Sequence, residues 1–178
     1  YLRDYMKKWV EENKKPDGSD YDIYRDGLKI YTTIDSRMQL HAETAVTAHM
    51  ANLQEEFFRQ SKDNKNAPFV NISSVETQRI LNQAMKSSNR WAVMKAMDKS
   101  EEEIIKSFSE KTKMTVFSWK GEKDTLMTPL DSIRYYKHFL QSGLMAMEPQ
   151  TGNVKAWVGG INYKYFQYDH VGQGARQV

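Results

Sequence analysis

Few residues in this chain have the types and spacing that catalysis or metal binding requires. The sequence contains no cysteine, which excludes disulfides and thiolate metal sites. The four histidines lack metal-ligand spacing and are each interpreted as surface or half-buried side chains: His41, His49, His138 and His170. The first two would lie about two turns apart on a helix, too far for a shared ion. We therefore predict no metal site and no cofactor.

Two groups of acidic residues leave a chemical and a structural interpretation open. Asp35 precedes a helical pattern, so it either caps that helix or acts as a catalytic carboxylate. No partner acid or histidine has a required spacing, which favours the cap. The acids Glu101, Glu102 and Glu103 could bind a divalent cation, but on a helix they would splay around the axis. They follow Ser100 in a capping-box pattern and complement the positive end of a helix dipole.

The composition describes a soluble, helix-rich protein. The 178 residues include 26 basic and 23 acidic ones, for a net charge of +3, and 39% are hydrophobic. This length can bury a core in one domain or two small ones. The balanced charge argues against a nucleic-acid partner. No stretch reaches the roughly 18 apolar residues of a membrane span.

The N-terminal third is predicted to supply the elements around Asp35. Apolar residues at helical spacing indicate a helix at 1–12, and a loop follows at 14–20. Alternation from Leu28 to Ile34 predicts a strand. A helix should then run from Ser36 to about Arg59. Its expected inner face consists of Met38, Ala42, Ala45, Val46, His49, Met50, Leu53 and Phe57.

The region 50–141 is predicted to be mostly helical, with one hairpin near 114–128. Helical patterns occupy 73–85, 90–97 and 104–108. Ser73 and Glu76 fit a second capping box. After the hairpin, Asp131 can cap a short helix that extends to about residue 140. The aromatic residues are sufficient for a small core of this region's own: Phe108, Phe117, Trp119, Tyr135 and Tyr136.

The most specific local pattern lies at 142–161. Two apolar runs at 144–147 and 154–158 flank a turn, in which Pro149 presets a turn φ and Gly152 can take a positive φ. This pattern predicts an antiparallel hairpin. Because the runs are nearly continuous in apolar character, we expect the hairpin to be covered on both faces.

Three motifs resemble one known family. The stretch 143–163, GLMAMEPQTGNVKAWVGGINY, is similar to the hairpin that opens the transpeptidase domain of class A penicillin-binding proteins. GLKIYTTID at 27–35, continued by Met38-Gln39 and 42–46, resembles a second signature of this family. QGARQV at 173–178 resembles the segment that runs into the active-site motif. The three occur in family order, whereas the middle of the chain carries no motif of the family.

The family's catalytic motifs are absent from the sequence. It contains no S-x-x-K, no K-T-G and no counterpart of the acidic motifs of the glycosyltransferase domain. Ser87-Ser88-Asn89 formally fits S-x-N but falls on a helical segment, and Gln150-Thr151-Gly152 lacks the lysine of K-T-G. The resemblance places the reactive serine about two residues past Val178. We therefore predict no catalytic residue here and interpret the chain as a non-catalytic fragment.

The resemblance implies an α+β fold in three parts. Residues 1–49 would be the linker helix, strand and helix between the glycosyltransferase and transpeptidase domains. Residues 50–141 would be an inserted, mostly helical subdomain with a hairpin. Residues 142–178 would be the first hairpin and approach loop of the transpeptidase domain, with the hairpin belonging to its sheet.

The resemblance also implies a parent enzyme and partners. That parent would be anchored in the cytoplasmic membrane with this region on the periplasmic side. It would polymerise glycan strands from lipid II and cross-link peptidoglycan through a serine acyl-enzyme that penicillin mimics. The fragment would position the two active sites and could dock a regulatory protein through 50–141. Alternatively, the chain is a stand-alone protein–protein interaction module.

Two further expectations concern surfaces near the C-terminal hairpin. The loop at 162–170 is rich in aromatic residues: Tyr163, Tyr165, Phe166 and Tyr168. They could stack nucleic-acid bases, but the charge favours packing against the transpeptidase core. Tyr168-Asp169-His170 stands where the family has an F-(N/D)-(R/H) element. The hairpin at 143–160 would leave an exposed sheet edge, through which two copies of the chain could pair as a homodimer.

Overall fold

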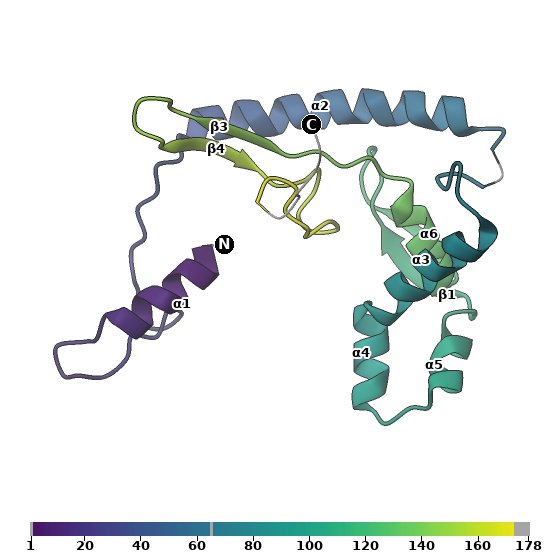
Figure 1. Cartoon of the computed structure of the whole chain (residues 1–178), viewed down its shortest axis with the longest axis horizontal. Helices are drawn as coiled ribbons and strands as arrows, with labels where there is room; N and C mark the ends of the chain where they lie inside the picture. Colours follow the sequence, from purple (N-terminus) through teal and green to yellow (C-terminus); the bar gives the residue numbers. More distant parts are fainter. Residues whose placement is uncertain (1, 65, 173–178) are drawn as a thin grey trace. The chain divides into compact units, whose positions relative to one another are not determined.

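The structure is a computed structural model that describes residues 2–64 and 66–172 (Figure 1). Six helices occupy α1 (Leu2–Glu12), α2 (Ser36–Ser61), α3 (Ser74–Lys86), α4 (Asn89–Ala96), α5 (Glu101–Ser107) and α6 (Pro129–Lys137) within these residues. The strands are β1 (Thr112–Val116), β2 (Lys123–Met127), β3 (Leu144–Met147) and β4 (Val154–Val158). They form two antiparallel hairpins, β1–β2 and β3–β4, so the predicted α+β class is confirmed.

The chain divides between Thr33 and Ile34 into two compact units. In the first, the predicted helix is observed as α1, and Met6 is its buried residue. The ring centroids of Trp9 and Tyr21 lie 5.4 Å apart, so the chain beyond the predicted loop packs back on the helix. No helix within the described ranges has both the length and the apolar content to cross a membrane.

The predicted strand Leu28–Ile34 is not formed. The segment has no assigned strand, and Ile30 and Tyr31 are 47% and 89% exposed. Alternation shows which side chains would share a face, but a strand also needs a neighbouring backbone along its length. A backbone bond to β4 is made at Asp35, directly after the segment, where its N–H donates to the Lys155 carbonyl at 2.9 Å.

Helix α2 runs beside β4 in the second unit (Figure 1). Its 26 residues confirm the predicted range, and its buried residues recur at every fourth position: Ala42, Val46, Met50 and Gln54. The predicted inner face was too wide, because four of its members are exposed: Met38, Ala45, His49 and Leu53. A helix that covers a two-stranded hairpin buries a narrower stripe than one enclosed on several sides.

The β3–β4 hairpin has the predicted position and pairs Leu144 with Val158 and Ala146 with Ala156. These inner residues join a core with α2, the chain after β1, the end of α6 and the loop after β4. Its buried members are Ala42, Val46, Met50, Phe117, Phe139, Ala156, Val158 and Ile161. We call this group the joint core, because it draws on segments from 42 to 161.

The other face of the β3–β4 hairpin is uncovered along β3. Met145 and Met147 are 45% and 51% exposed. Met145 lies opposite Trp157, which is only partly buried. The prediction that both faces are covered is therefore wrong for the described residues, since α2 covers one face alone. Both strands do carry apolar side chains on two faces, but no described residues cover the face of β3 that carries Met145 and Met147.

Helices α3, α4 and α5 form a small lobe around a second core. Its buried members are Met85, Trp91, Ile104 and Phe108. Helix α6 contributes to both cores, because Leu130 and Ile133 pack on the lobe core while Tyr135 and Tyr136 pack on the joint core. The expectation of one aromatic core for 50–141 is therefore wrong. Phe108 lies in the lobe, whereas Phe117 lies in the joint core with α2 and β4.

The helix starts follow capping chemistry, with two corrections. Ser100 and Glu103 form the predicted capping box of α5. Ser73 caps α3 by accepting the Glu76 N–H at 3.1 Å, but the Glu76 carboxylate binds Arg79 instead of returning to the cap. Helix α6 starts earlier than predicted: its cap is Thr128, which accepts the Asp131 N–H, and Pro129 takes the first helical position. Asp131 is thus inside the first turn.

Candidate functional site

The first turn of α2 closes the outer edge of β4. The Asp35 carboxylate accepts the N–H groups of Arg37 at 2.9 Å and Met38 at 3.1 Å. These bonds, from Met38 and then Arg37, hold the pKa of Asp35 below its ordinary value. The structure thus supports the cap interpretation. The Asp35 N–H binds the Lys155 carbonyl, so the cap also attaches the helix to the strand.

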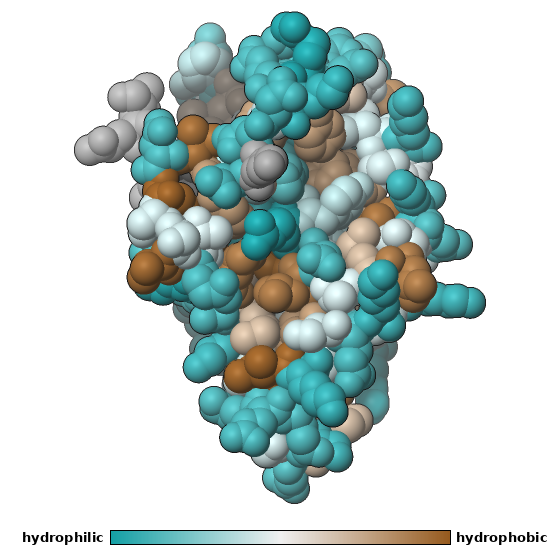
Figure 2. Space-filling view, turned by 90° about the vertical axis from the view of Figure 1, so that its right-hand side faces the viewer, coloured by the Kyte–Doolittle hydropathy of each residue, from teal (hydrophilic) through white to brown (hydrophobic). Residues whose placement is uncertain are grey.

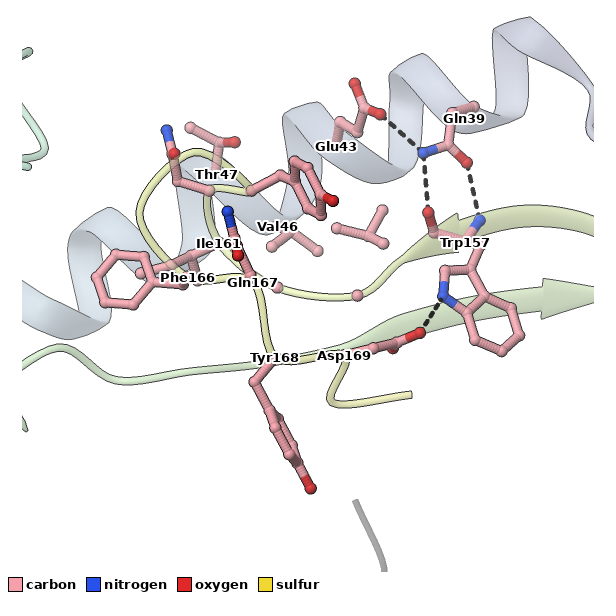
Figure 3. A pocket seen from close by; sticks show the side chains of 15 residues that line it. Gln39, Glu43, Val46, Thr47, Trp157, Ile161, Phe166, Gln167, Tyr168 and Asp169 are labelled. Carbon is pink, nitrogen blue, oxygen red and sulfur yellow. Dashed lines mark hydrogen bonds between the residues drawn. The ribbon is translucent and has the colours of Figure 1, made fainter. Parts of the chain in front are cut away.

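Gln39, one turn further along α2, continues this edge with its side chain. Its Nε2 donates to the Trp157 carbonyl at 3.0 Å, and its Oε1 accepts the Trp157 N–H at 2.8 Å (Figure 3). The same Nε2 donates to Glu43 at 2.7 Å. A side-chain amide has one acceptor and two donors, so it can satisfy both backbone groups that a further strand would bind. Gln39 therefore replaces a third strand at this position.

Gln54 makes an equivalent attachment at the other end of α2. It is fully buried, with 0% exposure, and its Nε2 donates to the His138 carbonyl at 2.9 Å. Its Oε1 accepts the Leu140 N–H at 2.8 Å. Sequence reasoning missed both glutamines because it sought apolar residues. The four-residue period that contains Ala42, Val46 and Met50 continues to Gln54 and could have identified it.

Asp169 anchors the loop that follows β4. Its Oδ2 accepts the Trp157 Nε1–H at 3.1 Å, and its Oδ1 accepts the N–H groups of Val171 at 2.9 Å and Gly172 at 3.1 Å. Burial acts to raise the pKa of Asp169, but these hydrogen bonds outweigh it and hold the pKa below its ordinary value. The His170 N–H also donates to the Gly159 carbonyl at 2.8 Å. The loop is thus fastened to the strand by both side chain and backbone.

A cavity of about 450 Å³ lies between α2 and this loop (Figure 3). Its described lining includes two carboxylates, Glu43 and Asp169, and contains no lysine, arginine or histidine. The hydroxyl groups of its lining belong to Thr47, Tyr163 and Tyr168. Gln39 and Asp169 already hold backbone groups of the protein. Gln39 therefore fixes α2 to β4 and Asp169 fixes the loop to β4, and this arrangement is the candidate site for positioning.

The structure separates the remaining predicted chemical residues. His41 and His49 lie exposed on α2, and His138 follows α6 with Nδ1 at 3.0 Å from the Arg134 carbonyl oxygen. His170 lies in the Asp169 loop, where its ring centroid is 4.9 Å from that of Tyr168. No group of three or more metal-ligating side chains gathers within the described ranges.

The acidic and serine clusters at helix ends have structural contacts. Glu101 to Glu103 lie in the first turn of α5, as the dipole interpretation predicted. Ser88 caps α4, accepting the Trp91 N–H at 3.3 Å and donating to the Met85 carbonyl at 2.7 Å. The S-x-N pattern thus marks the junction of α3 and α4. The predicted approach segment 173–178 lies outside the described residues.

The aromatic loop divides between core and surface. The ring of Phe166 lies 5.4 Å from that of Phe117 and 5.6 Å from that of Tyr136, and Tyr165 stacks on Tyr136 at 6.2 Å. Tyr165 and Phe166 thus pack in this chain's own core, which corrects the expectation that they await the transpeptidase core. Tyr163 is 80% exposed.

One family comparison bears on the middle of the chain. Residues 64–140 match the model of the penicillin-binding protein middle domain. Comparisons with curated proteins and with solved structures gave no significant match. The matched range contains α3 to α6, where none of the three sequence motifs lies. The match therefore supports the interpretation of this region as the linker region of a penicillin-binding protein.

Proposed function

We propose that this chain is a non-catalytic linker region of a class A penicillin-binding protein and positions the glycosyltransferase and transpeptidase active sites. One observation carries the positioning role. The joint core unites α2 through Val46, the middle region through Phe117 and Phe139, and the C-terminal hairpin through Val158. Because packed interiors deform little, segments that share a core keep a fixed geometry.

The parent in this proposal is a periplasmic, membrane-anchored enzyme of peptidoglycan synthesis. It polymerises lipid II into glycan strands and cross-links their peptides through a serine acyl-enzyme. The middle-domain match supports a parent of this family. The class A assignment rests on the three sequence motifs, in particular the 143–163 hairpin.

The transpeptidase domain is proposed to pair with the open edge of β3 and to cover the exposed side chains on its outer face. Asp35 and Gln39 occupy backbone groups on the outer edge of β4, whereas Met145 and Met147 leave an apolar strip on β3. An uncovered apolar strip beside an open strand edge favours the addition of another strand. In the isolated chain, the same edge would pair two copies.

A regulatory protein is the further proposed partner, at the helical lobe. Val75, Val93 and Met97 are exposed on or next to α3 and α4. On the face shown in Figure 2, hydrophobic side chains form small groups among hydrophilic ones. These exposed side chains also favour the second candidate function, an interaction module whose flanks serve only as its scaffold.

The test uses the full-length gene product and fluorescent penicillin. We expect a serine adduct on the full-length protein and none on residues 1–178 alone. In the full-length protein, Phe139→Ala should weaken the joint core and lower peptide cross-linking per unit of glycan polymerised. Phe108→Ala in the lobe core is the matched control for loss of a buried ring. A full-length protein without penicillin adduct would contradict the assignment, and unchanged cross-linking in Phe139→Ala would contradict the positioning role.

A further inference from the structure

The chain leaves the β3–β4 hairpin through a set of short contacts centred on Asp169. One carboxylate binds the Trp157 indole on β4 and the two backbone N–H groups of Val171 and Gly172. A carboxylate that accepts several N–H groups fixes the direction of the backbone that supplies them. The Asp169 side chain, together with the His170 N–H that donates to the Gly159 carbonyl at 2.8 Å, therefore holds the last described residues beside β4.

Glycines allow the loop to approach the hairpin closely. A Cβ on Gly159 would lie 3.0 Å from Asp169 Oδ1 and 3.2 Å from its Cγ. A Cβ on Gly143 would lie 2.7 Å from Val171 Cγ2 and 3.1 Å from the Val171 backbone nitrogen. Gly160 is different, because its Cβ would meet nothing closer than 3.6 Å. Gly172 is also close, since its Cβ would lie 3.3 Å from Asp169 Oδ2 and 3.3 Å from Trp157 Cζ2, so the crowding surrounds the Asp169 contacts.

These contacts lie outside both hydrophobic cores. Neither Asp169 nor Trp157 belongs to the joint core, and the lobe core lies in α3 to α5. Residues that only stabilise a fold usually act through such cores or through buried polar groups. Loss of the Asp169 contacts should therefore redirect the loop while the rest of the unit stays folded.

We propose that the Asp169 contacts with Trp157, Val171 and Gly172 set the direction of the chain that leads to the transpeptidase serine. We call these contacts the lock. Asp169 is then a positioning residue for serine acylation. The inference rests on the proposed function, because the family resemblance places the serine about two residues past Val178. Because Asp169 holds the backbone at 171 and 172, we expect its loss to shift the chain that leads toward this serine. A misplacement of about 1 Å can reduce a rate on the order of 100-fold.

The experiment compares variants of the full-length protein in two assays. Asp169→Asn keeps an acceptor for the Val171 and Gly172 N–H groups but turns an amide N–H₂ toward the Trp157 N–H. We expect penicillin acylation to slow on the order of 10- to 100-fold, while glycan polymerisation and the melting temperature stay near wild type. Asp124→Asn, an exposed carboxylate that accepts from Thr115 on the other hairpin, is the control.

A double variant separates positioning from general damage. Trp157→Phe removes the indole N–H, so Asp169→Asn/Trp157→Phe has no opposed donors and should regain part of the acylation rate that Asp169→Asn loses. Gly159→Ala should slow acylation through crowding against Asp169, and its neighbour Gly160→Ala should not. These two variants alter no ionisable group.

The results of these assays distinguish the lock from general damage and from a wrong family assignment. Selective loss of acylation with partial recovery in the double variant supports the lock. Wild-type acylation in both Asp169→Asn and Gly159→Ala overturns it, as does a parallel loss of both activities with a large fall in melting temperature. Failure of the wild-type full-length protein to react with penicillin would instead contradict the proposed function, since no nucleophile would be present to position.

Discussion

The two hairpins of the second unit differ in how completely they are enclosed. In β1–β2, Met114 and Val116 face inward, while the outward positions carry the polar Lys113, Thr115 and Asp124, with Leu126 as the apolar exception. In β3–β4, α2 covers the inner face and Gln39 closes the β4 edge, yet Met145 and Met147 stay exposed on β3. A polar outer face is typical of a hairpin that ends a structure, and two apolar faces are typical of an internal strand pair.

This difference indicates which hairpin has an outer face with polar contacts of its own and which does not. Thr115 Oγ1 donates to Asp124 at 2.6 Å across β1–β2, so the outer face of that hairpin has polar contacts of its own. The corresponding position of β3–β4 is the pair of Met145 with Trp157. We infer that β1–β2 belongs to the linker region alone, whereas β3–β4 also presents a surface to a neighbouring domain.

The largest expected effect comes from a charge on the inner face of β3–β4. Ala156 is 1% exposed, so Ala156→Asp buries an unpaired carboxylate and should lower the free energy of unfolding by about 3 kcal/mol or more. Leu126→Asp places the same group on β2 opposite Lys113, where we expect a change of about 0.5 kcal/mol or less. Urea denaturation followed by circular dichroism measures both. Equal losses would contradict the assignment of Ala156 to an inner face and of Leu126 to an outer face.

The two glutamines of α2 should differ next in size. Gln54→Ala leaves the His138 carbonyl and the Leu140 N–H without partners in a buried site, which should cost about 2–4 kcal/mol. Gln39→Ala exposes the Trp157 groups to water and should cost about 1 kcal/mol. Thermal melts give the two values. A larger loss at Gln39 would show that the strand edge, and not the buried end of α2, limits stability.

Charges on the open side of β3 should change association more than stability. Met145→Lys and Met147→Lys should shift the free energy of unfolding of the isolated chain by about 0.5 kcal/mol or less. Both should reduce self-association, because lysine on an edge strand opposes pairing. Sedimentation at high concentration detects this, with Leu126→Lys on β2 as the control. A strictly monomeric wild-type chain would contradict pairing through this edge.

The smallest expected effect is the pH dependence of the α2 cap. The folded pKa of Asp35 is lowered, so its contribution to stability is fully present above the ordinary carboxyl pKa. That contribution is lost as the pH falls through the lowered folded value. Asp35→Asn keeps a capping acceptor without this titration. The melting temperature of the variant should therefore depend less on pH in the acid range than that of wild type, and identical profiles would contradict the assignment.

Local patterns predicted most of the elements but few of their attachments. The α2 range and the β3–β4 turn follow from signals within a few residues, namely Asp35 as cap and Gly152 with its φ of 72°. The Gln39 contacts with Trp157 span 118 residues, and the Gln54 contacts with His138 and Leu140 span 84 and 86. Such partners cannot be read from spacing, because the fold alone brings them together.

The failures have a related cause. Leu28–Ile34 alternates like a strand but has no neighbouring backbone along it, and a pattern of faces does not supply one. Asp169 was noted as part of a family element, but its role depends on the indole of Trp157, twelve positions earlier across a turn.

Helix α6 gives the unit a mechanical property. Its nine residues run from Pro129 to Lys137, with Leu130 in the first turn against the lobe core, and the chain just past the helix places Phe139 in the joint core. The hydroxyl of Tyr135 donates to the Phe117 carbonyl at 2.7 Å, so a hydrogen bond also attaches the helix to the chain after β1. A tilt of α6 would displace side chains in both cores at once. A force applied to the lobe would thus be transmitted to the C-terminal hairpin through α6.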